Sequence, residues 1–223
     1  MSGASRSLFS FLGGRRSTEP EPSTVVAPAT SPQDDPTHPT KALARFLKVL
    51  QSHERPALID LGPVVGSNVT FFGEQLGCKI RVEDIASEIE RHLKAGTIEA
   101  LPAALEARFP EGGDGVDGIL CWDVFDYLER PAAQALASAL VRRLNPGGVL
   151  LGLFSTTNPT DETYTKFVVV DEQTLRYRPY HASRPRQKSL LNRDVTKLFD
   201  GLEVTESFLM KNNVRETLLR KPE

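Results

Sequence analysis

Apolar positions begin to recur regularly near residue 40 of the chain. Leu43, Phe46, Leu47 and Leu50 follow the spacing i, i+3, i+4, i+7, which predicts an amphipathic helix. A short apolar run at residues 57–61 comes next, and it lacks the alternation of a half-exposed strand. A run of this kind is typical of a strand buried on both faces of a sheet.

Strand-like and helix-like segments then alternate along the chain. Ser67 is a suitable N-cap for a helix that follows the first strand. Residues 79–84 alternate apolar and polar side chains and end in two acids, which predicts a second strand. Residues 116–128 contain another buried strand, and a helix at 132–144 leads through the turn "NPGG" into a strand at 149–154. This order predicts an α/β fold, with a doubly wound, mostly parallel, Rossmann-like sheet between helices.

The C-terminal third departs from this alternation. Residues 202–211 and 214–221 are consecutive strand-like runs joined by Asn212 and Asn213, which predicts an antiparallel hairpin at the sheet edge. Before it, an insertion at about 156–192 is too long for a simple connection, and insertions of this length are usually functional or disordered. The pattern within the insertion predicts a second, smaller hairpin.

The first 39 residues differ in composition from the rest. Residues 17–39 are rich in Pro, Ser, Thr and acids, and they contain too few large apolar groups to offset the entropy of ordering. We therefore expect a disordered N-terminal arm and tether at 1–39 and a domain at 40–223. Residues 1–16 contain apolar side chains among arginines. We interpret this segment either as a disordered tail or as a docking peptide for a partner protein or an anionic surface.

Composition narrows the class of protein further. Of the 223 residues, 39% are hydrophobic and 25% are charged, as in soluble proteins, and no apolar stretch is long enough for a membrane span. The formal net charge of -2 provides no general attraction to nucleic acid. Cys78 and Cys121 lie in apolar segments, which indicates reduced core cysteines in a cytoplasmic protein. The histidines lack ligand-like spacing, so we expect no metal site.

Four segments carry a further likeness. They are the first strand and turn at 58–66 ("LIDLGPVVG"), the second strand at 80–85 ("IRVEDI"), the fourth strand at 116–128 ("VDGILCWDVFDYL") and the helix, turn and fifth strand at 141–154 ("VRRLNPGGVLLGLF"). In this order they resemble the class I S-adenosylmethionine-dependent methyltransferases, over about residues 41–221. The resemblance implies transfer of a methyl group from S-adenosylmethionine to an acceptor that the sequence does not identify.

The resemblance and the predicted sheet place a cofactor site at the same edge. Ligands of doubly wound sheets bind at the carboxyl ends of the strands, where the strand order reverses. Gly62 and Gly66 would let the backbone of the first turn approach a ligand, and Asp60 would orient the turn or an ammonium group. At the end of the second strand, Asp84 would accept the ribose hydroxyls, with Glu83 as the alternative.

Two departures from the family pattern leave other interpretations open. Val64 stands where the middle glycine of the turn is usual, and its branched side chain would crowd the nucleoside or the turn. No third strand ending in an acid follows Asp84. These departures favour a catalytically inactive module that binds a partner, whereas the retained glycines and strand-end acid favour an enzyme. A Rossmann-type dinucleotide enzyme is a third interpretation, disfavoured because "GxGxxG" is absent.

Candidate catalytic and substrate-binding residues follow the fourth strand and occupy the insertion. Asp123 and Asp126 are candidate catalytic groups, although an acid there also suits an N-cap. Trp122 is interpreted as a core residue and Tyr127 as a residue at the lip of the site. The insertion is either a lid that binds an anionic or base-bearing substrate or a cover for the sheet edge. The substrate-binding candidates are Tyr127, Arg176, Arg178 and Tyr180.

Overall fold

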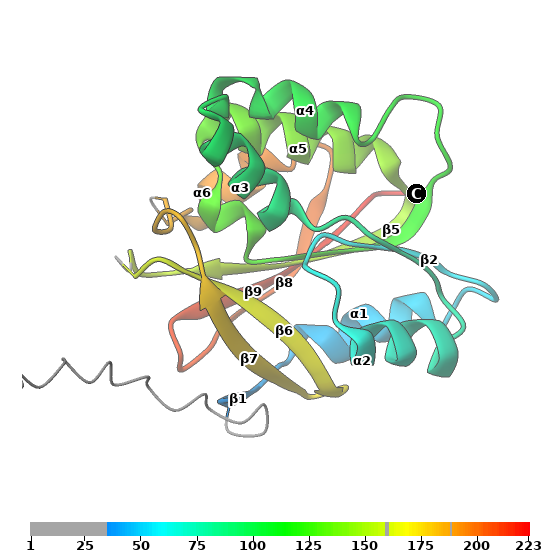
Figure 1. Cartoon of the computed structure of the whole chain (residues 1–223). Helices are drawn as coiled ribbons and strands as arrows, with labels where there is room; N and C mark the ends of the chain where they lie inside the picture. Colours follow the sequence, from blue (N-terminus) through cyan, green and yellow to red (C-terminus); the bar gives the residue numbers. More distant parts are fainter. Residues whose placement is uncertain (1–34, 159–160, 188) are drawn as a thin grey trace, which may run out of the picture. The chain divides into compact units, whose positions relative to one another are not determined.

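The computed structural model describes residues 35–158, 161–187 and 189–223 (Figure 1). The arm predicted at 1–39 therefore lies mostly outside the described residues, and the candidate docking peptide at 1–16 lies wholly outside them. Within the described residues, no helix has the length and apolar character needed to cross a bilayer. In the same residues, no group of three or more His, Cys, Asp or Glu side chains is arranged to hold a metal ion. Cys78 and Cys121 are buried free thiols, as expected.

A six-stranded sheet forms the centre of the fold. Its strands are β2 Ala57–Asp60, β3 Lys79–Val82, β4 Val116–Trp122, β5 Leu144–Ser155, β8 Glu203–Leu209 and β9 Val214–Arg220. Their order is β3-β2-β4-β5-β9-β8, and the first four are parallel. β9 pairs antiparallel with β5 and with β8, which confirms the C-terminal hairpin. The predicted doubly wound, mostly parallel α/β class is confirmed.

Helices cover both faces of this sheet. They are α1 Ala42–Leu50, α2 Gly66–Val69, α3 Ile85–Ala95, α4 Leu101–Ala107, α5 Arg130–Arg143 and α6 Asn192–Leu198. Figure 1 shows α1 and α2 on one side of the sheet and α3 to α6 on the other. Two apolar cores result, one including Ile89, Leu136 and Phe199, and the other including Phe46 and Phe72.

A second, three-stranded sheet is built mainly from the insertion. It consists of β1 Thr37–Pro39, β6 Thr163–Asp171 and β7 Thr174–His181, in the antiparallel order β1-β7-β6. The insertion thus contains the predicted hairpin. β1 belongs to the stretch that composition assigns to the tether, so ordered structure begins before Thr40. The composition does not reveal β1, because composition reflects side chains and this strand is held by backbone pairing with β7. The adjacent Asp35–Arg178 ion pair, at 2.7 Å, also holds it.

The segments around the first turn differ in detail from the sequence pattern. α2 begins at Gly66, and Val65, whose backbone is extended, takes the N-cap position predicted two residues later at Ser67. The chain continues as a π-helix over Thr70–Gln75, with Leu76 as its C-cap, and turns at the following Gly77, where φ is +66°. Between β3 and β4 the chain forms helices and no strand, which confirms the absence of the usual third strand.

Candidate functional site

The carboxyl ends of β2 and β4 define the place where a doubly wound sheet binds its ligand. The chain leaves β2 toward β3 on one side and returns to β4 on the other, so the strand order reverses between them. Loops diverge at such a point and leave room for a ligand. The turn at residues 60–66 and the end of β4 meet there, and we call this region the crevice.

Asp60 closes the first turn with its own side chain. The carboxylate is buried, and its Oδ1 accepts a hydrogen bond from the Gly62 backbone N–H at 2.9 Å. Burial raises the pKa of Asp60 to about 6, against the effect of this hydrogen bond. Val64 is 66% exposed and points to solvent, so it does not crowd the turn, while its effect on a bound nucleoside stays a prediction. A Cβ on Gly66 would meet no atom within 4 Å.

Trp122 lies across this turn. It is the last residue of β4, and its φ of +48° is one that bulky L residues rarely adopt. The indole Nε1 donates to Asp60 Oδ1 at 2.6 Å, and the ring stacks on Phe167 of β6 with centroids 5.2 Å and planes 8° apart. A Cβ on Gly62 would lie 2.8 Å from Trp122 Cδ1. Trp122 is therefore a core residue, as expected, and it also fills the space that Gly62 leaves free.

The cavity that remains in the crevice has a volume of about 10 Å³, room for about one water molecule. Its lining is mostly apolar and includes Gly62, Asp123 and the aromatic residues Trp122, Tyr127, Tyr164 and Tyr180. Tyr127 is buried and does not form a lip, because its ring packs on Tyr164 at 4.6 Å, and Tyr164 packs on Tyr180 at 5.4 Å. These packed, tilted rings, two of them from the insertion, close the crevice.

The two acids after β3 are held in different ways. Glu83 is buried and forms ion pairs with Arg81 and with Arg108, the latter at 2.9 Å. Asp84 is half-buried and caps α3, accepting hydrogen bonds from the Ser87 N–H at 3.0 Å and from the Ser87 hydroxyl at 2.7 Å. Asp84 is thus the more accessible of the two strand-end acids.

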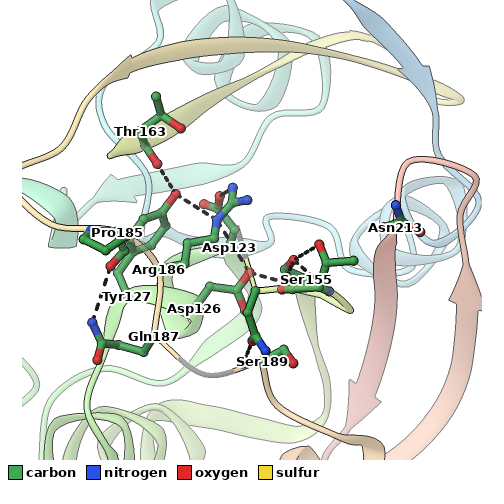
Figure 2. A network of polar contacts seen from close by, with 12 residues as sticks. Asp123, Asp126, Tyr127, Ser155, Thr163, Pro185, Arg186, Gln187, Ser189 and Asn213 are labelled. Carbon is green, nitrogen blue, oxygen red and sulfur yellow. Dashed lines mark hydrogen bonds and ion pairs between the residues drawn. The ribbon is translucent and has the colours of Figure 1, made fainter. Parts of the chain in front are cut away.

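Asp123 and Asp126 meet at Arg186 (Figure 2). Arg186 comes from the segment after β7, and its Nη2 donates to Asp123 Oδ2 at 2.8 Å. Its Nε donates to the Tyr127 hydroxyl at 3.0 Å and lies 3.9 Å from Asp126 Oδ2. Asp126 Oδ2 also accepts a hydrogen bond from the Ser155 backbone N–H at 2.8 Å. Two buried carboxylates therefore share one cation.

This arrangement raises the pKa values of both carboxyls. Burial, and then the charge of Asp123, raise the pKa of Asp126 to about 7. Burial also raises the pKa of Asp123, and Arg186 limits that rise. The Oδ1 atom of Asp126 is buried and has no hydrogen-bond partner among the described residues. The pair can therefore hold a proton near neutral pH, as catalytic acids and some structural networks do.

Asn68 of α2 fixes the β6–β7 hairpin over the crevice. Its Nδ2 donates to the Phe167 carbonyl at 2.7 Å, and the Val169 N–H donates to its Oδ1 at 2.8 Å. The side-chain amide thus pairs with β6 much as a neighbouring strand would. Because Phe167 also stacks on Trp122, the hairpin and the indole are held together.

The four substrate-binding candidates separate into two groups. Tyr127 and Tyr180 line the cavity, whereas Arg176 and Arg178 are not among its lining residues. Both arginines lie on β7, and Arg178 donates to the Asp35 carboxylate at 2.7 Å. In the described conformation, the arginines and the tyrosines do not form one surface around the cavity.

Comparison with solved structures identifies the architecture. An S-adenosylmethionine-dependent methyltransferase from Clostridium acetobutylicum ATCC 824 aligns with 81% of this chain and 91% of its own, at a TM-score of 0.51 and 12% identity. The chain has the fold of class I methyltransferases. TehB from Haemophilus influenzae aligns with 79% of this chain at 16% identity and a TM-score of 0.45. This chain covers 61% of the length of TehB. The N-methyltransferase NodS from Bradyrhizobium japonicum WM9 is 15% identical over 82% of this chain and 95% of its own, also at 0.45. No protein-family model and no curated protein sequence matches the chain.

Several residues around the crevice of this methyltransferase fold were not singled out in the sequence. Tyr164 and Phe167 meet the crevice only because the insertion folds back over it, and Asn68, just after the first turn, bonds to that hairpin. Arg186 lies in a basic and aromatic stretch whose composition does not show which arginine reaches the acids. Trp122 is interpreted from the sequence only as a core residue, although its place directly before Asp123 at the end of a strand is a signal that it borders the crevice.

Proposed function

We propose that the chain binds S-adenosylmethionine in the crevice and transfers its methyl group to an acceptor. The observation that carries the proposal is the turn of Asp60 and Gly62, which lies where the strand order reverses. The methyltransferase fold supports it, because ligands of doubly wound sheets bind at this edge. S-adenosylmethionine supplies an electrophilic methyl group, and the protein's contribution is chiefly to align it with a nucleophile.

The polar groups around the crevice suit the cofactor. The Asp60 carboxylate would accept hydrogen bonds from its ammonium group, and Asp84 would accept them from its ribose hydroxyls. Glu83 is the poorer choice, because it is buried and ion-paired with two arginines, whereas Asp84 is half-buried and, among the described residues, bonded only to Ser87. Gly62 and Gly66 would bring the backbone of the turn close to the ligand.

The room in the crevice does not suit the cofactor in the described conformation. A cavity of about 10 Å³ is far smaller than the several hundred Å³ of an ordinary small-molecule site. The Trp122 indole takes the space beside Gly62 and already bonds to Asp60. Binding therefore requires a more open crevice than the described one.

We assign proton transfer at the acceptor to the acids that follow β4. Asp123 lines the cavity, and Asp126 lies behind it on the same arginine. Their raised pKa values would let this pair take a proton from the acceptor near neutral pH. Tyr127 and Tyr180 would contact the acceptor, and the hairpin over the crevice would exclude water.

Calorimetry on the full chain with S-adenosylmethionine and S-adenosylhomocysteine tests the proposal. We expect both to bind, and we expect Asp84→Asn to weaken binding about tenfold or more, because an amide loses one of the two acceptor oxygens. The remaining oxygen can still cap α3. The matched control is Asp194→Asn, which changes a helix-terminal acid on α6 that accepts from the Leu191 N–H. No heat and no thermal shift at millimolar ligand would contradict the proposal.

A catalytically inactive module that binds a partner is the second candidate. Its specific support is the closed crevice, where Trp122 bonds to Asp60 and stacks on Phe167. A protein of this kind would bind neither ligand, and the docking peptide expected at residues 1–16 would supply a partner contact. A cytoplasmic location remains a prediction for either function.

A further inference from the structure

Trp122 presents to the crevice an N–H donor and a flat aromatic ring, two kinds of group that the proposed methyl donor carries at separate positions. Its Nε1–H donates to Asp60, the acid proposed to accept from the ligand's ammonium group. Its flat ring stacks almost parallel on Phe167, as a planar base stacks on an aromatic side chain. The contact beside Gly62 places the ring against a backbone position that carries no side chain. The indole is therefore positioned as an internal substitute for a ligand.

The backbone at Trp122 is irregular in both its φ angle and its strand pairing. Its φ of +48° lies in a region that is costly for a bulky residue, and such outliers cluster at ligand clamps and switch regions. The pairing of β4 with β5 also shifts register between Leu120, which faces Leu151, and Trp122, which faces Gly152. Register shifts of this kind re-aim a side chain next to a site.

We propose that Trp122 is an internal occupant of the crevice that competes with a nucleoside-bearing ligand for Asp60 and for the face of Phe167. The inference rests on the proposed function, because the competing ligand is the methyl donor S-adenosylmethionine or its product S-adenosylhomocysteine. The crevice is shut while the indole lies on Asp60, and ligand binding displaces it. The apparent affinity is then the intrinsic affinity reduced by the fraction of molecules that are open.

The only tryptophan of the 223 residues is Trp122, so its fluorescence reports on this side chain in the unmodified protein. S-adenosylhomocysteine is titrated into the full chain while the emission maximum is recorded. The free protein should emit at short wavelength, because Trp122 is 3% exposed. We expect a red shift that saturates with the same midpoint as calorimetric binding, because the displaced indole meets water.

Variants test the competition directly. Trp122→Ala removes the occupant and should bind S-adenosylhomocysteine about tenfold or more tightly than the wild type. Trp122→Phe keeps a ring that can stack on Phe167 but lacks the N–H donor to Asp60, so its affinity should be intermediate. The control is Phe208→Ala, which removes an aromatic side chain from β8 at the far edge of the sheet and should bind as the wild type does. Circular dichroism shows whether each variant folds.

The outcomes separate this inference from the proposed function. Tighter binding by Trp122→Ala, or a saturating red shift in the wild type, supports displacement of the indole. Binding by the wild type with no change in emission, and with equal affinity in folded Trp122→Ala, overturns the inference and leaves the proposed function standing. Absence of binding by both the wild type and folded Trp122→Ala overturns both. The fluorescence result is decisive by itself if Trp122→Ala does not fold.

Discussion

Asp126 is 2% exposed and shares Arg186 with a second buried acid. Burial, with the charge of Asp123, raises its pKa from the ordinary 3.8 to about 7. Between these two values the folded protein keeps the proton and the unfolded chain has lost it, so the unfolded state binds fewer protons. The free energy of unfolding contributed by this group must therefore fall as the pH rises from about 4 to about 7 and then level off.

We expect Asp126→Asn to remove this pH dependence. Asn keeps an oxygen that can accept from the Ser155 N–H but carries no proton to lose. Urea unfolding at several pH values from 5 to 8 should show the wild type losing stability relative to the variant, by up to about 1.4 kcal/mol per pH unit below pH 7. Asp171→Asn, a change at an exposed acid in the β6–β7 turn, should follow the wild-type profile. Parallel profiles for the wild type and Asp126→Asn would show that the buried carboxyl is already ionised.

The sequence predicts which residues lie at the carboxyl edge of the sheet, but it does not predict the directions in which their side chains point. Asp60 ends β2, Asp84 and Asp123 come just after β3 and β4, and the carboxyl ends of parallel strands must lie at one edge of the sheet. Sequence does not show that Val64 points to solvent or that Trp122 turns back onto Asp60. Those directions depend on backbone angles and on the hairpin, which packs from more than 40 residues away in the sequence.

Among the elements, the β6–β7 hairpin has the greatest effect on the crevice. Its position depends on Asn68, which satisfies one carbonyl and one N–H of β6 from the side of α2. Both hydrogen bonds are buried, so their loss leaves polar groups of β6 without partners. The edge of the small sheet is thus closed by a side chain where a further strand would otherwise be needed.

Asn68→Ala should therefore loosen the hairpin. We expect the free energy of unfolding to fall by about 2–3 kcal/mol, the usual cost of leaving buried donors and acceptors unpaired. Urea unfolding measures this loss, and hydrogen exchange should show that the Val169 amide, which donates to Asn68, exchanges faster. Asn192→Ala, at an exposed position at the start of α6, is the control and should change stability by less than about 0.5 kcal/mol. Unchanged exchange at Val169 would mean that strand pairing alone holds the hairpin.

Element types were predicted more successfully than element boundaries. The parallel strands, the missing third strand and both hairpins follow from apolar periodicity and turn residues, and the structure confirms them. The cap preference of Ser67 predicts Ser67 as the N-cap of α2, but Val65, whose backbone is extended, is the N-cap, so the helix begins two residues earlier than predicted. The π-helix at Thr70–Gln75 has no sequence signature, because it shares the apolar spacing of an ordinary helix.

At the scale of the whole molecule, the small sheet links the N-terminal segment to the crevice. β1 pairs with β7, β7 pairs with β6, and β6 carries the ring that stacks on Trp122. Composition alone could not reveal this chain of contacts, since residues 37–39 contribute backbone pairing and little apolar surface. We therefore propose that the folded domain begins at about Asp35, with the N-terminal arm and tether preceding it.

Two truncated proteins test that boundary. A chain lacking residues 1–34 keeps β1 and the Asp35–Arg178 ion pair, so its free energy of unfolding should equal that of the full chain within about 0.5 kcal/mol. A chain lacking residues 1–39 keeps Thr40, whose hydroxyl accepts from the Leu43 N–H at the start of α1, but loses the pairing of β1 with β7. We expect this second chain to be less stable by about 2 kcal/mol, because several backbone hydrogen bonds and one ion pair are lost. Urea unfolding compares the two, and equal stability would return the boundary to Thr40.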